Sequence, residues 1–190
     1  MERPYIEDKA FERMNFSETA LVKGDYECCT FSSCDLSNAD LSDFRFIDCS
    51  FTACNLSNAV LTKASFQEAD FKECKMLGLP FDTCNPLGLT LSFENCQLNH
   101  ASFFRVKLGR IRFINCALQE VDFTEANLNG AHFDQCDLLN SIFENTLLEK
   151  ADFTTAFNYT FDPENNYLRG AKFSMPSVTG LLNKYDIDIQ

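Results

Sequence analysis

The sequence contains no tryptophan, only two histidines, and few glycines and prolines. With Gly 7 and Pro 5 in 190 residues, it lacks the composition of a collagen-like chain or a flexible linker. No apolar run approaches the roughly 20 residues that cross a bilayer. The N-terminal residues hold no apolar signal core, so we expect a cytoplasmic protein without membrane contact. Basic residues are also scarce: 16 Lys and Arg against 28 Asp and Glu give a net charge of −12, which disfavours direct binding to nucleic acid.

The patterns that accompany catalysis and cofactor binding are missing as well. The histidines, His100 and His132, are isolated from one another, and neither glycine-rich phosphate-binding pattern occurs. Ten cysteines are present, but the only close pair, Cys28 and Cys29, followed by Cys34, matches no zinc spacing. We therefore expect no enzyme, no cofactor and no metal site.

A five-residue repeat is the dominant feature of what is present. Large apolar residues occupy every fifth position from Phe11 to Phe81, and after a shift of two residues Phe and Leu alternate from Phe93 to Phe153. The position two residues before these centres is typically small or apolar, and nine of the ten cysteines fall there. Because a free cysteine behaves as a small hydrophobe, we interpret these thiols as core filler rather than as redox or metal groups.

A period of five fits neither a helix nor a plain strand, so it predicts a chain that turns every five residues. Four such units make a square coil of twenty residues, and a second period of twenty is visible in Cys34, Cys54 and Cys74. Identical side chains would then stack in ladders, as they do in a solenoid whose repeats contact only their neighbours.

Tandem units of the form A-[D/N]-[L/F]-x-x, such as SNADL at 37–41 and EKADF at 149–153, resemble those of the pentapeptide-repeat protein family. The resemblance covers about residues 9–173. It implies an all-β fold, a right-handed quadrilateral β-helix of about eight coils with a short C-terminal helix. We expect the β-helix over residues 1–173, with a register slip near 82–92 where prolines and a glycine cluster between Pro80 and Gly88, and a separate C-terminal segment over 174–190.

The C-terminal segment leaves the repeat. Ser174 precedes apolar residues at helical spacing, and Ile187 and Ile189 then alternate with aspartate as a short strand would. One role for the segment is to cover the last coil. The family resemblance implies another, because topoisomerase-protecting members dimerise end to end through a C-terminal helix. The candidate dimerisation residues are Val178, Leu181, Leu182, Tyr185 and Ile187.

Acidic residues are concentrated in the second half of the repeat. Ten of them lie between Phe113 and Glu164 with Lys150 as the single base, whereas a small basic cluster, 105–112, marks the middle of the chain. The acids that we expect to group near two adjacent faces form a candidate partner-binding surface: Glu120, Asp122, Glu125, Asp137 and Glu144. An acidic surface kept for solubility is the plain alternative.

Two functions follow as hypotheses. A rod with dense negative charge is similar to duplex DNA, and the family resemblance implies a specific case: quinolone-resistance members of the Qnr and mycobacterial type bind DNA gyrase or topoisomerase IV as DNA mimics and protect it from quinolones or toxins. The alternative is a structural scaffold for another protein, with no role at a topoisomerase. Both hypotheses predict a non-enzymatic interaction protein, and the first also predicts a homodimer.

Overall fold

Positive backbone φ angles recur two residues after the repeat centres. Residues such as Asn38, Asp43 and Asp48 adopt φ between 49° and 61°, although none is a glycine. The left-handed conformation costs an L-residue roughly 1–2 kcal/mol. Here it turns the chain through a corner every five residues, and hydrogen bonds between successive coils offset the cost. Four corners close one coil.

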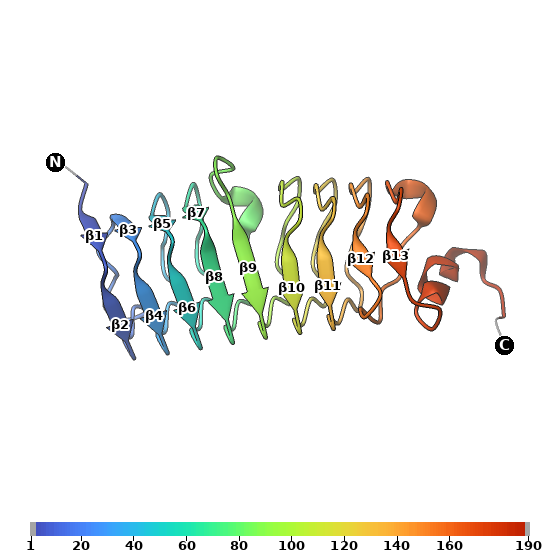
Figure 1. Cartoon of the computed structure of the whole chain (residues 1–190). Coiled ribbons are helices and arrows are strands. Elements are labelled where there is room, and N and C mark those ends of the chain that lie inside the picture. Colours follow the sequence, from blue (N-terminus) through green and yellow to red (C-terminus); the bar gives the residue numbers. More distant parts are fainter. Residues whose placement is uncertain (1–2, 189–190) are drawn as a thin grey trace.

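The coils stack into a long shaft of parallel strands, which the computed structural model describes for residues 3–188 (Figure 1). One sheet has the order β1-β3-β5-β7, and the other has the order β13-β12-β11-β10-β9-β8-β6-β4-β2. The four strands of the first sheet are β1 (Tyr5–Glu7), β3 (Asp25–Glu27), β5 (Arg45–Ile47) and β7 (Ser65–Gln67). The nine of the second are β2 (Ala10–Glu12), β4 (Thr30–Ser32), β6 (Ser50–Thr52), β8 (Ala69–Lys72), β9 (Leu91–Glu94), β10 (Arg112–Ile114), β11 (His132–Asp134), β12 (Asp152–Phe153) and β13 (Lys172–Phe173).

The shaft has four faces, which we number in chain order. Face 1 holds the four-stranded sheet and, further along, the bridges Lys107–Asn127, Asn127–Leu147 and Leu147–Tyr167; face 2 holds the nine-stranded sheet. Face 3 carries the bridges from Asn15 to Phe157, and face 4 those from Asp40 to Val60 and from Pro80 to Ile142. Nine stacked strands on face 2 span eight coil-to-coil steps, so the predicted β-helix of about eight coils is confirmed.

The repeat centres fill the shaft as ladders of like side chains. The ring of Phe113 stacks between Phe93 and Phe133 at centroid distances of 5.3 and 5.4 Å, and it meets the rings of Phe103 and Phe123 edge-on. All five rings are fully buried. Offset stacking and edge-to-face contact are the favoured aromatic arrangements, which gives a physical reason for the abundance of phenylalanine.

The cysteines occupy a specific kind of corner. Many corners close with a turn bond, as where the Ala131 amide donates to the Leu128 carbonyl over 3.0 Å. In the described residues, no such bond reaches the carbonyls of the six face 2 centres from Phe11 to Phe113, and a thiol from the next coil points at each of these oxygens over 3.3 to 3.6 Å. These thiols belong to Cys34, Cys54, Cys74, Cys96, Cys116 and Cys136. The small apolar character of cysteine explains why these six residues are buried. The hydrogen bond from each thiol to a carbonyl that lacks a turn bond explains why they occur at this corner.

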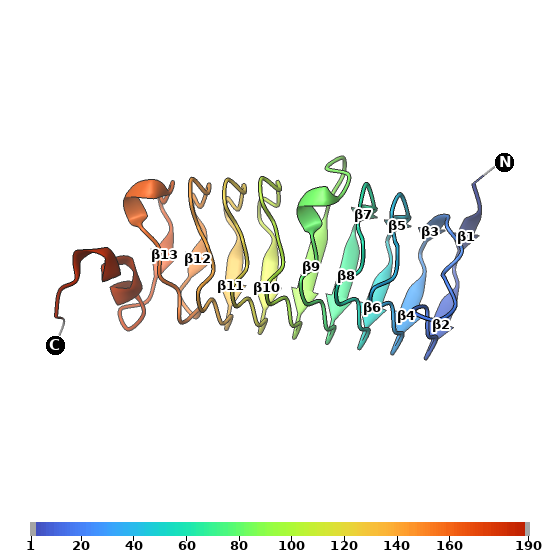
Figure 2. The same ribbon diagram turned by 180° about the vertical axis from the view of Figure 1, so that it is seen from behind.

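The shaft is interrupted once, between β8 and β9. Phe71 pairs with Phe93, an offset of 22 residues, whereas neighbouring strands such as β10 and β11 are offset by 20. The two extra residues follow a short 3₁₀ helix, η1 (Phe81–Thr83), and the loop that holds them projects beyond the other corners (Figures 1 and 2, green). Face 2 continues through this point, whereas the sheet of face 1 ends at β7.

The C-terminal segment differs from the expected helix and strand. After η2 (Pro163–Asn165) and β13, two 3₁₀ helices follow, η3 (Val178–Leu181) and η4 (Asn183–Tyr185), at the end of the shaft (Figure 1). Ile187 lies outside any strand of the described residues, because Asp186 ends η4 in a left-handed conformation. The expected strand partner Ile189 lies outside the described residues.

Candidate partner-binding surface

Two of the five predicted acids accept hydrogen bonds that stabilise the turns in which they lie. The Asp122 carboxylate accepts a hydrogen bond from the Thr124 amide over 2.8 Å, and Asp137 accepts one from the Leu139 amide over 3.2 Å. A neutral residue makes the same contact elsewhere, since the Asn127 side chain accepts from the amide two residues later. This turn geometry, in which a side-chain oxygen replaces a backbone acceptor, explains the Asp or Asn that precedes so many repeat centres.

Two more of the acids face a basic side chain in the preceding coil. Glu125 receives two hydrogen bonds from the Arg105 guanidinium, at 2.7 and 3.0 Å, and this contact lowers the pKa of the Glu125 carboxyl. Glu120 lies 3.2 Å from Nδ1 of His100. Both pairs are exposed, so each contributes little to stability. Glu144, the fifth acid, is exposed on the following coil.

The structure brings the five acids to one side of the shaft. Glu120 and Asp137 belong to face 3 and its corner, whereas Asp122, Glu125 and Glu144 belong to face 4 and its corner. All five lie on two consecutive coils. The basic cluster is divided around the shaft: Arg105 sits on the face 4 corner against Glu125, and the other three bases lie on faces 1 and 2, at Lys107, Arg110 and Arg112.

The five predicted dimerisation residues divide into two groups. Leu181 is buried, and Val178 is packed against the core, so these two cover the last coil. Tyr185 and Ile187 are exposed at 52% and 57%, and Leu182 is half-buried. Lys184 fastens the segment to the shaft through ion pairs with Asp162 and Glu164, at 2.7 and 2.9 Å.

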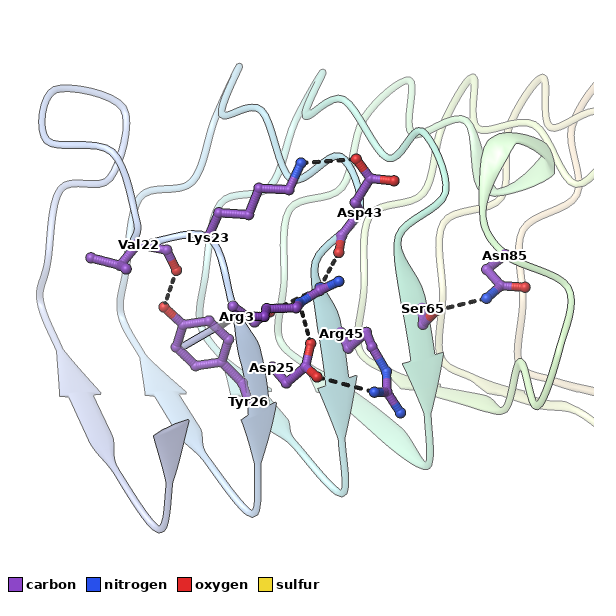
Figure 3. Close-up of polar contacts among 10 residues, drawn as sticks. Arg3, Val22, Lys23, Asp25, Tyr26, Asp43, Arg45, Ser65 and Asn85 are labelled. Atoms are coloured by element: carbon purple, nitrogen blue, oxygen red, sulfur yellow. Dashed lines mark hydrogen bonds and ion pairs between the residues drawn. The ribbon is translucent and has the colours of Figure 1, made fainter. Parts of the chain in front are cut away.

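Charged contacts near the N-terminus were missed from the sequence. On face 1 the Asp25 carboxylate lies between the guanidinium groups of Arg3 and Arg45, the latter at 3.0 Å (Figure 3). Further along the same face, the Asn85 side chain donates to the Ser65 hydroxyl over 3.1 Å and so ties the start of the projecting loop to β7 (Figure 3). For the Asp25–Arg45 and Ser65–Asn85 pairs the signal was the twenty-residue spacing, which puts each residue beside its partner in the next coil.

Residues 3–188 hold no group of three or more His, Cys, Asp or Glu side chains placed to hold a metal ion. Within the same residues, no helix has the length and apolar character that a membrane span requires. Burial raises the pKa of the Cys49 and Cys84 thiols to about 12, so these two are poorly suited to react as thiolates.

Known proteins of similar sequence or fold show which family this chain belongs to. A search of curated proteins finds no match. Among solved structures, HetL from the cyanobacterium Nostoc, a pentapeptide repeat protein involved in the regulation of heterocyst differentiation, is similar over 91% of this chain and 85% of its own, with 14% identity and a TM-score of 0.52. QnrB1, a plasmid-mediated fluoroquinolone resistance protein, is 21% identical over 97% of this chain and all of its own, with a TM-score of 0.49. The family model described as "Pentapeptide repeat region" matches residues 24–103 and 89–156, and the chain therefore belongs to the pentapeptide-repeat family.

Proposed function

We propose that the protein is a non-enzymatic interaction protein whose acidic side occupies the DNA-binding groove of a type II topoisomerase, such as DNA gyrase or topoisomerase IV, and protects that enzyme from quinolones or toxins. The observation that carries the proposal is the alignment of the five acids on faces 3 and 4. The family resemblance of the repeat supports the choice of partner. The fold is compatible with a scaffold role as well, and that role is the second candidate.

The density of the aligned charge supports mimicry of DNA. Adjacent coils advance by about 4.8 Å, the usual strand spacing. Five carboxylates on two consecutive coils thus amount to about one charge per 2 Å of shaft, close to the ≈1.7 Å per charge of duplex DNA. Arg105 offsets one of the five, and the remaining bases of the central cluster lie on other faces. A groove that attracts DNA would attract such a surface by the same field.

A specific observation favours the scaffold alternative. Asp122 and Asp137 already act as turn acceptors, and Glu125 is held by Arg105, so most of the aligned acids have a use within the shaft. An acidic exterior also keeps a solenoid soluble without any partner. The two candidate functions therefore differ in whether the free carboxylates, above all Glu144, contact a partner.

A supercoiling assay with purified DNA gyrase, with and without ciprofloxacin, tests the proposed partner. We expect the protein to restore supercoiling in the presence of the drug, or to inhibit the enzyme at higher protein concentration. The variant Glu120→Lys/Glu144→Lys should lose both effects. The matched control Glu12→Lys/Glu149→Lys makes the same change in net charge at exposed acids away from this surface and should keep them.

Each outcome of this assay has a distinct meaning. No effect of the wild-type protein over a wide concentration range refutes the topoisomerase partner and favours the scaffold. Equal activity of the wild type and Glu120→Lys/Glu144→Lys at moderate salt refutes electrostatic mimicry by this surface. Circular dichroism of each variant establishes that the β-helix is intact.

We also propose that the protein is a homodimer joined through its C-terminal segment. The exposed Tyr185 and Ile187 support this arrangement, because they lie beyond the residues that cover the last coil. Tyr185→Ser/Ile187→Ser should halve the mass measured by light scattering while the melting temperature of the shaft changes little. Removal of Val178 and Leu181 would be a poorer test, because it uncovers the core. An unchanged mass for the double variant, or a monomeric wild type, refutes the dimer.

A further inference from the structure

The interruption of face 1 leaves part of the shaft without a neighbouring coil. The face 1 sheet ends at β7, and the face 1 bridges begin again only at Lys107. Between them runs the projecting loop, residues 85–90, whose Asn85 is tied to β7 and whose Gly88 has a φ of 73°. The loop departs from the ladder geometry, so the coil that follows it meets no strand on that side.

Backbone groups of Lys107 and Gly109 are left without partners as a result. One coil further on, the Asn127 amide donates to the Val106 carbonyl over 2.8 Å, and the Asn127 and Asn129 carbonyls accept from the Leu108 and Arg110 amides at 2.9 and 2.8 Å. The equivalent groups of the preceding coil are the Lys107 amide and the Lys107 and Gly109 carbonyls. None of the three has a hydrogen-bond partner among residues 3–188.

The exposure of this segment agrees with an open edge. Lys107 and Gly109 are exposed, whereas Asn127 and Asn129 at the same positions of the next coil are half-buried. An unpaired strand edge is a template for another extended chain. Unpaired strand edges are usually found at the two ends of a sheet. Here an unpaired edge lies in the middle of the shaft, between the face 1 sheet that ends at β7 and the face 1 bridges that begin at Lys107.

Two adjoining hollows run along this edge. The first, of about 490 Å³, is mainly apolar and is lined by residues that include Leu87, Leu89, Phe104 and Val106. The second, of about 310 Å³, lies beside Arg110 and Arg112. Both hollows are lined by Leu89 and Lys107, so together they form one trough across face 1.

The charges on the rim of the trough select the kind of ligand. Arg105 is held by Glu125, and Arg112 lies 3.4 Å from Asp134. Lys107 and Arg110 have no ion-pair partner within the described part of the chain. Asp82 also lines the first hollow, so Lys107 and Arg110 leave the trough with one net positive charge, and in a protein of net charge −12 this attracts acidic ligands to the end of the trough beside the two cations.

We propose that the trough binds an extended acidic peptide segment of a partner protein by strand addition to residues 107–109. The peptide would pair with the Lys107 and Gly109 backbone groups, place apolar side chains against Leu87, Leu89 and Phe104, and present carboxylates to Lys107 and Arg110. Main-chain hydrogen bonds supply affinity in this mode of recognition, and the alternate side chains supply specificity. The site is independent of the proposed topoisomerase surface on faces 3 and 4 and takes a partner of the opposite charge.

Amide exchange in the ¹⁵N-labelled free protein tests the open edge. The Lys107 amide should exchange rapidly, and the Asn127 and Leu147 amides, which are bonded to the preceding coil, should exchange at least about 100-fold more slowly. Equal protection of Lys107 and Asn127 would show that the edge is already covered and would overturn the proposal.

Titration of the same sample with a capped hexapeptide that alternates aspartate with valine or leucine tests the binding. Shift changes should concentrate at residues 104–112, and the Lys107 amide should become protected. A peptide with lysine in place of aspartate, and one with a central proline that lacks the pairing amide, should each bind at least about tenfold more weakly. Lys107→Glu/Arg110→Glu should weaken binding similarly, and Lys150→Glu/Arg169→Glu, a matched charge reversal further along face 1, should not.

The binding experiment also has refuting results. An absence of shift changes at about 5 mM acidic peptide rules out a site of useful affinity. Equal binding of the proline-containing peptide rules out strand addition, and equal loss in both double variants rules out a specific role for Lys107 and Arg110. Gyrase protection should be unchanged by Lys107→Glu/Arg110→Glu, so the two proposals can fail separately.

Discussion

Replacement of Cys116 by alanine and by serine distinguishes two explanations of the cysteine positions. Cys116 is 2% exposed, and its thiol points at the Phe93 carbonyl over 3.6 Å and at the Ile114 carbonyl over 3.3 Å. If the residue serves only as a small apolar filler, serine should be the worse replacement, because it buries a hydroxyl. If the thiol matters as a donor, serine should be the better one.

The expected loss in the free energy of unfolding has two contributions, the burial of the sulfur atom and the hydrogen bond that the thiol donates. Loss of the buried sulfur costs about as much as loss of a buried methylene, roughly 0.8 kcal/mol. Loss of a weak hydrogen bond costs about 0.5–1 kcal/mol net. Cys116→Ala should therefore lower the free energy of unfolding by about 1.3–1.8 kcal/mol. Cys116→Ser should lose about half as much, because a hydroxyl can reach the same carbonyl, as the Ser141 hydroxyl reaches the Leu118 carbonyl over 2.5 Å.

Urea unfolding followed by circular dichroism measures both differences. The matched control is Ala131→Ser, because the equivalent acceptor in the preceding coil, the Leu108 carbonyl, already accepts a turn bond from the Ile111 amide over 3.1 Å. There the added hydroxyl has no unpaired turn carbonyl to serve and should destabilise the protein. If Cys116→Ser proves less stable than Cys116→Ala, the donor explanation is wrong and the thiols are core filler alone.

Three further predictions concern the ends, the corners and the core of the shaft. Gly180→Ala should detach the C-terminal segment, because an added Cβ would overlap the Tyr159 carbonyl oxygen. Faster amide exchange in the last coil, with the first coils unaffected, would show this detachment, and unchanged exchange in the last coil would contradict it. Hydrogen bonds from Ser42 lower the pKa of Asp40, so its contribution to stability is present above the ordinary value of about 3.9 and is lost as pH falls through the lower folded value. Asp40→Asn, which keeps the acceptor, should flatten the fall in urea midpoint below about pH 4, and a fall as steep as in the wild type would refute this. Phe113→Leu should cost about 1–2 kcal/mol in urea unfolding, because it breaks two ring stacks at once, whereas Phe173→Leu at the end of the ladder loses one, to Phe153, and should cost less.

The repeat allowed most of the fold to be predicted, because each large apolar residue and each small residue before it reports an inward position. The register change of two residues was also visible, at the prolines and the glycine near position 86. The twenty-residue period places side chains of successive coils next to one another, but it does not show which neighbours bond to each other and which bond to their own turn. That is why the ion pair of Arg105 with Glu125 and the turn role of Asp122 become apparent only in the structure.

The C-terminal segment was harder to predict for a physical reason. Outside the repeat, its few apolar residues fit a helix, a strand or a cap, and only contact with the last coil decides among them. Val178 and Leu181 are at helical spacing because they reach the same end of the core, and two 3₁₀ turns satisfy that requirement without an α-helix. Local pattern is a weak guide where tertiary contact selects the conformation.

An unpaired strand edge at Lys107 is compatible with a stable shaft because the stabilising contacts of a solenoid are local. Each coil contacts only its neighbours, so a defect on one face need not propagate to the others. Face 2 crosses the interruption with four register pairs between β8 and β9, and the aromatic ladder continues there through Phe71 and Phe93 at 5.4 Å. The two extra residues are therefore absorbed on face 1 alone. A rigid shaft can in this way carry a locally unpaired strand edge, and that edge is the feature of the repeat most suited to recognition of another chain.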